Sequence, residues 1–145
     1  MSQFKLSLMF VTEKISSEEA LKLIQHVVKL TANYNHRPVA VSICGPEGEL
    51  IGFLRMDGTS PAASRIAQNK AYTAAIDRTE TSIMGERMRG KDNPAFWGDD
   101  RVTGFGGGVP VIQNGKVIGG IGVSGLPEAD DIVVAKDAVK AVFGQ

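Results

Sequence analysis

The stretch from Gly104 to Gly125, GFGGGVPVIQNGKVIGGIGVSG, constrains the fold of this chain more than any other segment. It holds nine of the chain's 17 glycines. At its centre Asn114-Gly115 stands between two β-branched runs, and this dipeptide is typical of a two-residue type I′ turn, whose central positions both need a positive φ. We therefore predict an antiparallel hairpin around this turn.

The other glycines of the stretch need a separate reason, because glycine inside a strand lowers stability. We expect Gly119, Gly120 and Gly122 to let a helix lie close on the sheet. Gly106, Gly107 and Gly108 lead into the first strand, where successive N–H groups could face an anion. Residues 120–125 match a dinucleotide-binding GxGxxG, but the strand before them belongs to a hairpin, so we do not expect a nucleotide site.

Helix and strand signals fill the rest of the chain. A capping box of Ser16 and Glu19 predicts a helix over residues 17–33 with Ala20, Leu21, Ile24, Val27 and Val28 on its packed side. Alternation predicts strands over residues 39–44 and 50–56, which the turn residues between them should join as an antiparallel hairpin. Ser60-Pro61 predicts a helix start. Further helices are expected at residues 62–76, 82–88 and 127–143. Residues 4–12 are expected to form a short strand or an arm, and residues 77–103 a long, mostly irregular segment.

Composition narrows the classes of function. The 145 residues carry 16 basic and 16 acidic side chains, which gives no electrostatic reason to expect nucleic acid or an anionic membrane as partner. One cysteine, Cys44, and two histidines are too few for an internal disulfide or a zinc cluster. No signal peptide or apolar run long enough to span a membrane is visible, so we expect a cytoplasmic protein.

Several separated motifs resemble the GlcG/HbpS family, whose domain also forms the C-terminal part of PduO-type proteins. The resemblance extends from about residue 15 to residue 143, and we interpret residues 1–145 as one such domain with residues 1–14 as the arm or short strand. It is carried by RMDG at residues 55–58, KAYTAA at 70–75, GGVPV at 107–111, VIGGIGVSG at 117–125 and Asp130-Asp131.

The resemblance implies an α/β (α+β) fold with a central antiparallel sheet flanked by helices, similar to profilin-like folds, and assembly into dimers or larger rings. It also implies haem or a corrinoid such as cobalamin as the ligand of some members. Haem-binding members use a histidine near the first helix, which points to His26; a surface or interface histidine is the alternative, and His36 is a weaker candidate. The chain differs from relatives at Gly45-Pro46-Glu47-Gly48, where an aspartate-glycine turn is common.

The residues themselves suggest further binding candidates. Arg55 and Asp57 are expected on one strand face, either gripping a carboxylate ligand or pairing with each other. Lys70 stands among alanines of the second helix, either partly desolvated and able to bind an anion or solvated on the outer face. Phe96-Trp97 could form the wall of a ligand site or anchor the long loop.

Two functions remain open from the sequence. The first is an oligomeric cytoplasmic binding protein for a small anionic or tetrapyrrole ligand. The second is a cofactor-independent hydratase, isomerase or hydrolase acting on a small carboxylate through Arg55, Asp57, Lys70 and the glycine loop. No nucleophile motif or metal-binding spacing supports a specific reaction, and Cys44, in mid-strand, is expected to be an inert buried thiol.

Overall fold

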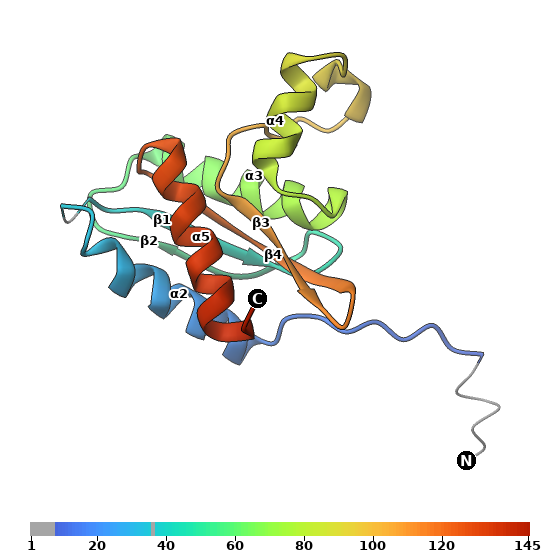
Figure 1. Ribbon diagram of the computed structural model, residues 1–145, viewed down its shortest axis with the longest axis horizontal. Helices are drawn as coiled ribbons and strands as arrows, with labels where there is room; N and C mark the ends of the chain where they lie inside the picture. The colour runs from blue at the N-terminus through green and yellow to red at the C-terminus, as the bar shows by residue number, and fades with distance from the viewer. Residues whose placement is uncertain (1–7, 36) are drawn as a thin grey trace.

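A four-stranded antiparallel sheet lies at the centre of the computed structural model, which describes residues 8–35 and 37–145 (Figure 1). The strands are β1 (Ala40–Cys44), β2 (Leu50–Arg55), β3 (Gly108–Gln113) and β4 (Lys116–Ser124), in the order β2-β1-β4-β3. Every pairing is antiparallel. The α+β architecture expected from the sequence is confirmed.

Both predicted hairpins are present. Asn114 and Gly115 join β3 to β4 with φ values of 52° and 75°, as a type I′ turn requires. Residues 45–49 join β1 to β2, and the register shifts between Ile43 and Cys44, where β2 carries one extra residue. Because β1 and β4 pair directly, the two hairpins form one sheet whose edges are β2 and β3.

Helix α3 (Pro61–Asp77) covers one face of the sheet, and glycines set how closely it lies. The Ser60 hydroxyl accepts a hydrogen bond from the Ala63 N–H at 3.1 Å, so Ser60 caps the helix as predicted. A Cβ at Gly120 would lie 2.6 Å from the Ala71 carbonyl oxygen, and one at Gly122 would lie 2.2 Å from that of Ala67. The predicted close approach is confirmed for these two glycines. Gly119 instead faces Ile15 and the Cys44 carbonyl.

Helices α2 (Ser17–Thr31) and α5 (Glu128–Phe143) cover the opposite face (Figure 1). The capping box of Ser16 and Glu19 is present. The prediction for the packed side of α2 was wrong at Leu21, which is 54% exposed, because the helix turns Leu23 into the core instead. The core between these helices and the sheet is mainly aliphatic and includes Leu23, Val27, Val41, Ile43, Val111, Ile121, Val123 and Val134.

Helix α4 (Thr81–Arg89) and the 3₁₀ helix η1 (Pro94–Trp97) form a lobe that projects from the body (Figure 1). Arg87 holds the lobe together. Its guanidinium bonds Asp77 at 2.9 Å and Asp92 at 3.0 Å, and lies 5.2 Å from the centre of the Trp97 ring. The irregular segment predicted for residues 77–103 therefore contains more helix than expected.

Residues 8–14 form an extended arm and no strand, so the strand alternative for residues 4–12 was wrong over residues 8–12. Residues 4–7 of that prediction lie outside the described part of the chain. Among the described helices, none is long and apolar enough to cross a membrane.

Candidate functional site

Lys70 is buried, and its ammonium group joins the two helical layers of the molecule. The side chain, 2% exposed, leaves α3 and donates to the Val123 carbonyl at 2.7 Å and to Asp131 Oδ2 at 3.1 Å. Asp131 belongs to the first turn of α5, on the other face of the sheet, and its Oδ1 accepts from the Leu126 N–H at 3.1 Å. A Cβ at Gly107 would lie 2.9 Å from Lys70 Nζ, so this glycine leaves the space that the ion pair occupies.

Burial disfavours both charges of this pair. It lowers the pKa of Lys70 and raises the pKa of Asp131, while the attraction between the two charges opposes both shifts. The two hydrogen bonds of the Lys70 ammonium group both go to groups of the protein itself. Lys70 is thus in the desolvated position that the sequence offered as one alternative. Its hydrogen-bond partners belong to the protein itself, so the contact is structural.

The glycine loop is occupied by the protein's own oxygen atoms. The Gly106 N–H donates to Glu128 Oε2 at 2.6 Å, and the Gly108 N–H donates to the Thr81 hydroxyl at 2.8 Å. The expectation that successive N–H groups of this loop face an anion was therefore wrong for Gly106 and Gly108. These bonds instead tie the loop to α5 and α4.

Arg55 and Asp57 do not share a strand face, because β2 ends at Arg55 and Asp57 lies in the turn beyond it. Arg55 Nε donates to the Thr59 carbonyl at 3.0 Å and so closes this turn. The described residues show no ion pair between Arg55 and Asp57. The expected shared face and the expected ion pair were therefore wrong, because the strand ends before Asp57, whereas binding of a carboxylate ligand by Arg55 stays a prediction.

His26 lies on α2 and contacts α5. Its Nε2 is 2.7 Å from Asp137 Oδ2, and the histidine side chain is 29% exposed. This arrangement is the interhelical histidine that the sequence allowed as an alternative to an iron ligand. His36 lies outside the described residues.

The aromatic pair of the lobe is split between packing and solvent. Phe96 is 80% exposed, whereas Trp97 is partly buried beneath Arg87. With Arg87 and Asp92 they line a shallow hollow of about 220 Å³. Trp97 contacts Arg87 of α4, and neither aromatic residue is buried, so the pair does not anchor the loop to the core and a role as a ligand wall stays a prediction.

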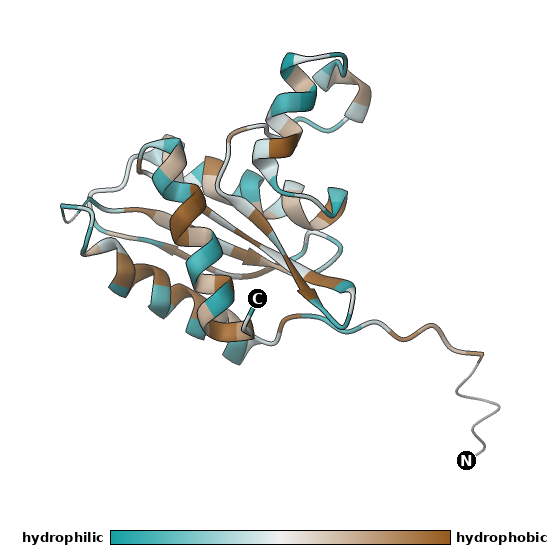
Figure 2. Cartoon of the chain, in the orientation of Figure 1, coloured by the Kyte–Doolittle hydropathy of each residue, from teal (hydrophilic) through white to brown (hydrophobic). Residues whose placement is uncertain are grey.

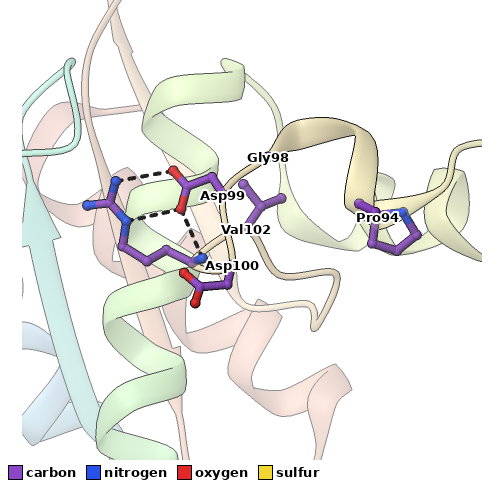
Figure 3. A pocket seen from close by; sticks show the side chains of 7 residues that line it. Pro94, Gly98, Asp99, Asp100 and Val102 are labelled. Atoms are coloured by element: carbon purple, nitrogen blue, oxygen red, sulfur yellow. Dashed lines mark hydrogen bonds and ion pairs between the residues drawn. The ribbon is translucent and has the colours of Figure 1, made fainter.

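A concavity with buried residues in its lining runs along α3, on the face of the sheet opposite α2 and α5. Two adjoining hollows of about 290 and 460 Å³ share Gln68, Asn69 and Arg101, and we call them together the α3 groove. The smaller hollow also contacts Ser42, Cys44, Leu50 and Tyr72, and the larger one contacts Arg65. A larger hollow of about 890 Å³ around residues 94–102 has no buried residue in its lining (Figure 3).

Two buried side chains form the floor of the α3 groove. Ser42 is 1% exposed and lines the smaller hollow. Cys44 is 2% exposed and donates from Sγ to the Ala71 carbonyl at 3.1 Å. Burial raises the pKa of Cys44 to about 12, so the thiol is inert at neutral pH as the sequence predicted.

Tyr72, Asp99 and Arg101 form a polar cluster at the mouth of the groove. Tyr72 Oη donates to Asp99 Oδ2 and accepts from Arg101 Nη2 at 2.6 Å, while the guanidinium lies 3.9 Å from the Tyr72 ring centre. Asp99, labelled in Figure 3, also accepts from Arg101 Nε at 3.1 Å. Hydrogen bonds from Arg101 and Tyr72 lower the pKa of Asp99 to about 2, and the bond to Asp99 raises the pKa of Tyr72.

Sequence reasoning missed this cluster. Tyr72 is on α3, whereas Asp99 and Arg101 follow η1, so that the contact joins residues 27 and 29 positions apart. The available signal was Asp99-Asp100-Arg101, a charged run inside a segment that already looked too long to be a passive connection. The groove can present guanidinium, phenol, amide and hydroxyl groups to a ligand that has carboxylates and an apolar face.

Comparison with known proteins identifies the family. The model of the family "Haem degrading protein HbpS-like" matches residues 15–140. Protein GlcG of Escherichia coli strain K12 is 38% identical over 113 residues, which are 78% of this chain and 84% of GlcG. The chain belongs to the HbpS-like family. The resemblance described from its motifs is thereby confirmed.

Solved structures of other proteins have the same fold. The Klebsiella pneumoniae protein ORFY aligns with a TM-score of 0.87 at 25% identity, over 100% of this chain and 98% of ORFY. A PduOC:heme complex aligns with a TM-score of 0.83 at 27% identity, over 90% of this chain and 96% of that protein. The PduOC structure thus holds haem on a backbone similar to this one.

Proposed function

We propose that this HbpS-like protein binds a tetrapyrrole, with haem as the first ligand to test, in the α3 groove. The observation that carries the proposal is the haem complex of PduOC, a similar fold in the same family. The small anionic ligand and the cytoplasmic location expected from the sequence belong to the same proposal. They have no independent support in the geometry.

The side chains of the groove fit the donor set of haem. Haem has an apolar macrocycle, two carboxylates and an iron that takes axial ligands, tyrosine oxygen among them. Leu50, 61% exposed, offers apolar surface, Arg65 and Arg101 offer guanidinium groups, and Tyr72 Oη in the smaller hollow offers an oxygen donor. Bound haem would supply redox and ligand-binding chemistry. The chain itself would orient the macrocycle and neutralise the carboxylates.

His26 is the competing axial ligand. It lies on α2, across the sheet from the groove, and Asp137 already engages its Nε2. Tyr72 lines the α3 groove, so within this proposal it is the axial ligand to test first, and binding to iron would require its Oη to exchange the contacts with Asp99 and Arg101.

The test is a set of absorbance titrations with haemin and with iron-free protoporphyrin, with cobalamin in parallel. We expect Arg101→Gln to weaken both porphyrins by about 10- to 100-fold, because it removes a charge-assisted hydrogen bond to a carboxylate. Tyr72→Phe should change the Soret band of bound haemin and leave protoporphyrin affinity nearly unchanged. His26→Ala is the matched control and should behave like the wild type.

The outcomes separate the parts of this proposal. Loss of the Soret shift in His26→Ala alone would retain haem binding and reject the α3 groove. Saturation by cobalamin without porphyrin binding would change the ligand class. No saturable binding of any tetrapyrrole would overturn the proposed function.

A second candidate function is binding of a small carboxylic acid in the same groove, which the Ser42 hydroxyl in the lining of the groove favours. A serine hydroxyl can donate one hydrogen bond and accept others, so it can recognise a hydroxyl group of a ligand. Ser42 at the floor and Arg101 at the mouth could hold the hydroxyl and the carboxylate of a short hydroxy acid. This places the small-carboxylate hypothesis on different residues from Arg55, Asp57 and Lys70.

Calorimetric titration with short hydroxy acids and their deoxy analogues tests this candidate. Ser42→Ala is expected to reduce the preference for the hydroxy acid by about 2- to 10-fold, the effect of one neutral hydrogen bond. The deoxy acids provide the control because they cannot use the Ser42 hydroxyl. Equal binding of both acids by the wild type, or binding of neither, would reject the candidate.

A further inference from the structure

A second hollow, of about 390 Å³, lies between helix α4 and the loop that leads into β3 (Figure 1). Met88 and Arg89 line it from α4, Phe105 lines it from the loop, and Glu128 lines it from the first turn of α5. We call this hollow the α4 pocket. It shares no lining residue with the α3 groove. The hydropathy colouring in Figure 2 shows that α4, which forms one wall, carries both hydrophilic and hydrophobic residues.

Two glycines hold the walls of the α4 pocket in contact. A Cβ at Gly85 of α4 would lie 2.2 Å from the Gly104 carbonyl oxygen, and a Cβ at Gly104 would lie 2.7 Å from the Gly85 Cα. A side chain at either position would force the helix and the loop apart. The Thr103 N–H donates to the Thr73 hydroxyl at 3.0 Å, which ties the same loop to α3. The pocket is therefore formed before a ligand arrives, which lowers the cost of binding.

One cation and one anion of the pocket lie beside the two neighbours of Phe105. Arg89 Nη1 would be 3.1 Å from a Cβ at Gly85, where α4 crosses Gly104, so the guanidinium lies near Gly104. Glu128 Oε2 accepts from the Gly106 N–H at 2.6 Å, so the carboxylate lies beside Gly106. The α-carbons of residues 104 and 106 are at most roughly 7 Å apart, because two residues of chain span no more than that. The two charges are close enough for one small molecule to reach both.

The two charges do not neutralise each other. Within residues 8–35 and 37–145, neither Arg89 nor Glu128 forms an ion pair with any side chain. Glu128 uses Oε2 for the loop, and a carboxylate has a second oxygen that can accept hydrogen bonds. A guanidinium group binds carboxylates in a forked geometry. The pair therefore suits a ligand that carries both a carboxylate and an ammonium group.

Met88 and Phe105 provide the apolar part of the pocket. Met88 Sδ would be 3.0 Å from a Cβ at Gly104, and Phe105 is 59% exposed. Methionine is unbranched and adapts to neighbouring groups of different shapes. An apolar surface with a few placed polar groups is the usual composition of a small-molecule site.

We propose that the α4 pocket binds a free α-amino acid with an apolar side chain. Arg89 binds the carboxylate, Glu128 binds the ammonium group, and Met88 and Phe105 contact the side chain. Repulsion defines the class as much as attraction does, because Glu128 disfavours a simple acid and Arg89 disfavours a simple amine. This proposal does not depend on the ligand of the α3 groove.

The first test is an NMR titration of the full-length, ¹⁵N-labelled protein with leucine, methionine and phenylalanine. We expect saturable shifts of the Gly104 and Gly106 amide signals and no shift at Gly115 in the β3–β4 turn. Leucinamide lacks the carboxylate and N-acetylleucine lacks the ammonium group, so each should bind about 10- to 100-fold more weakly than leucine. No saturable shift at Gly104 and Gly106, or equal affinity for leucine and its two derivatives, would overturn the proposal.

The second test assigns the two charges to the two ends of the ligand. Arg89→Gln should weaken leucine binding by about 10- to 100-fold without weakening that of leucinamide, which has no carboxylate to lose. Glu128→Gln should weaken leucine in the same way without weakening N-acetylleucine, and its amide oxygen can still accept from the Gly106 N–H. Arg65→Gln, in the α3 groove, is the matched control and should bind leucine like the wild type.

The outcomes distinguish ligand contact from a structural role. A variant that weakens leucine and the corresponding derivative equally would show that its residue only shapes the pocket, and the proposed pairing would be rejected. Loss of leucine binding in Arg65→Gln alone would move the amino acid to the α3 groove and also reject the proposal. Neither titration contains a tetrapyrrole, so failure here leaves the test of haem binding unaffected.

Discussion

Lys70→Met is expected to lower the free energy of unfolding by about 3–5 kcal/mol, the cost of breaking a buried ion pair by removing one partner. The methionine fills much of the same volume but leaves Asp131, which is 3% exposed, without its cation. It also removes the donor to the Val123 carbonyl. Urea unfolding followed by circular dichroism at fixed protein concentration measures the change.

The double variant Lys70→Met/Asp131→Leu separates loss of the ion pair from loss of packing. Replacing both charges with apolar groups of similar size removes the uncompensated carboxylate, so we expect much of the stability to return. A single variant as stable as the wild type would show that water reaches Asp131. A double variant less stable than the single one would show that the Leu126 N–H, bonded to Asp131, is the more important contact.

Gly122→Ala is expected to destabilise the fold by about 3 kcal/mol, at the upper end of the cost of overpacking. The new Cβ would lie 2.2 Å from the Ala67 carbonyl and 2.5 Å from the Ala71 N, both main-chain atoms of α3. To make room for the methyl group, α3 and β4 would have to move apart, and the contacts between the helix and the sheet would be lost. Thermal and urea denaturation measure the loss.

Gly52→Ala is the matched control, because it places the same methyl group on a strand of the same sheet. Its nearest neighbour is Ile24 Cδ1 at 3.1 Å, the end of a flexible side chain. We expect a change of less than about 1 kcal/mol there. Similar losses in both variants would mean that glycine is needed for strand conformation rather than for the approach of α3.

The local elements of the fold were predictable because their signals are short in range. Ser16 with Glu19, Ser60 with Pro61, and Asn114 with Gly115 each determine a helix start or a turn within four residues, and the structure confirms all three. The errors concerned the end of a strand and the rotation of a helix about its axis. Strand β2 ends at Arg55, so Asp57 lies in the turn that follows, and the packed side of α2 includes Leu23 rather than Leu21.

The candidate site was less predictable because its members are brought together by folding. Tertiary packing buries Lys70, and its charge is compensated by Asp131 of α5, 61 positions away in the sequence. The glycine loop could offer N–H groups to an anion only if Glu128 and Thr81 were elsewhere, and tertiary packing places both against it. Tyr72 acquires its partners only when the segment after η1 returns to α3.

The sequence by itself determined the α+β class, the two hairpins, the helices and, through separated motifs, the HbpS-like family, because these depend on periodicity and on short-range backbone preferences. Only the tertiary structure decided that Lys70 is an internal tie and that Ser42, Tyr72 and Arg101 share a groove. It also decided that Arg89 and Glu128 line one pocket. Burial and charge pairing depend on which elements pack together, and a side chain's role follows from those neighbours.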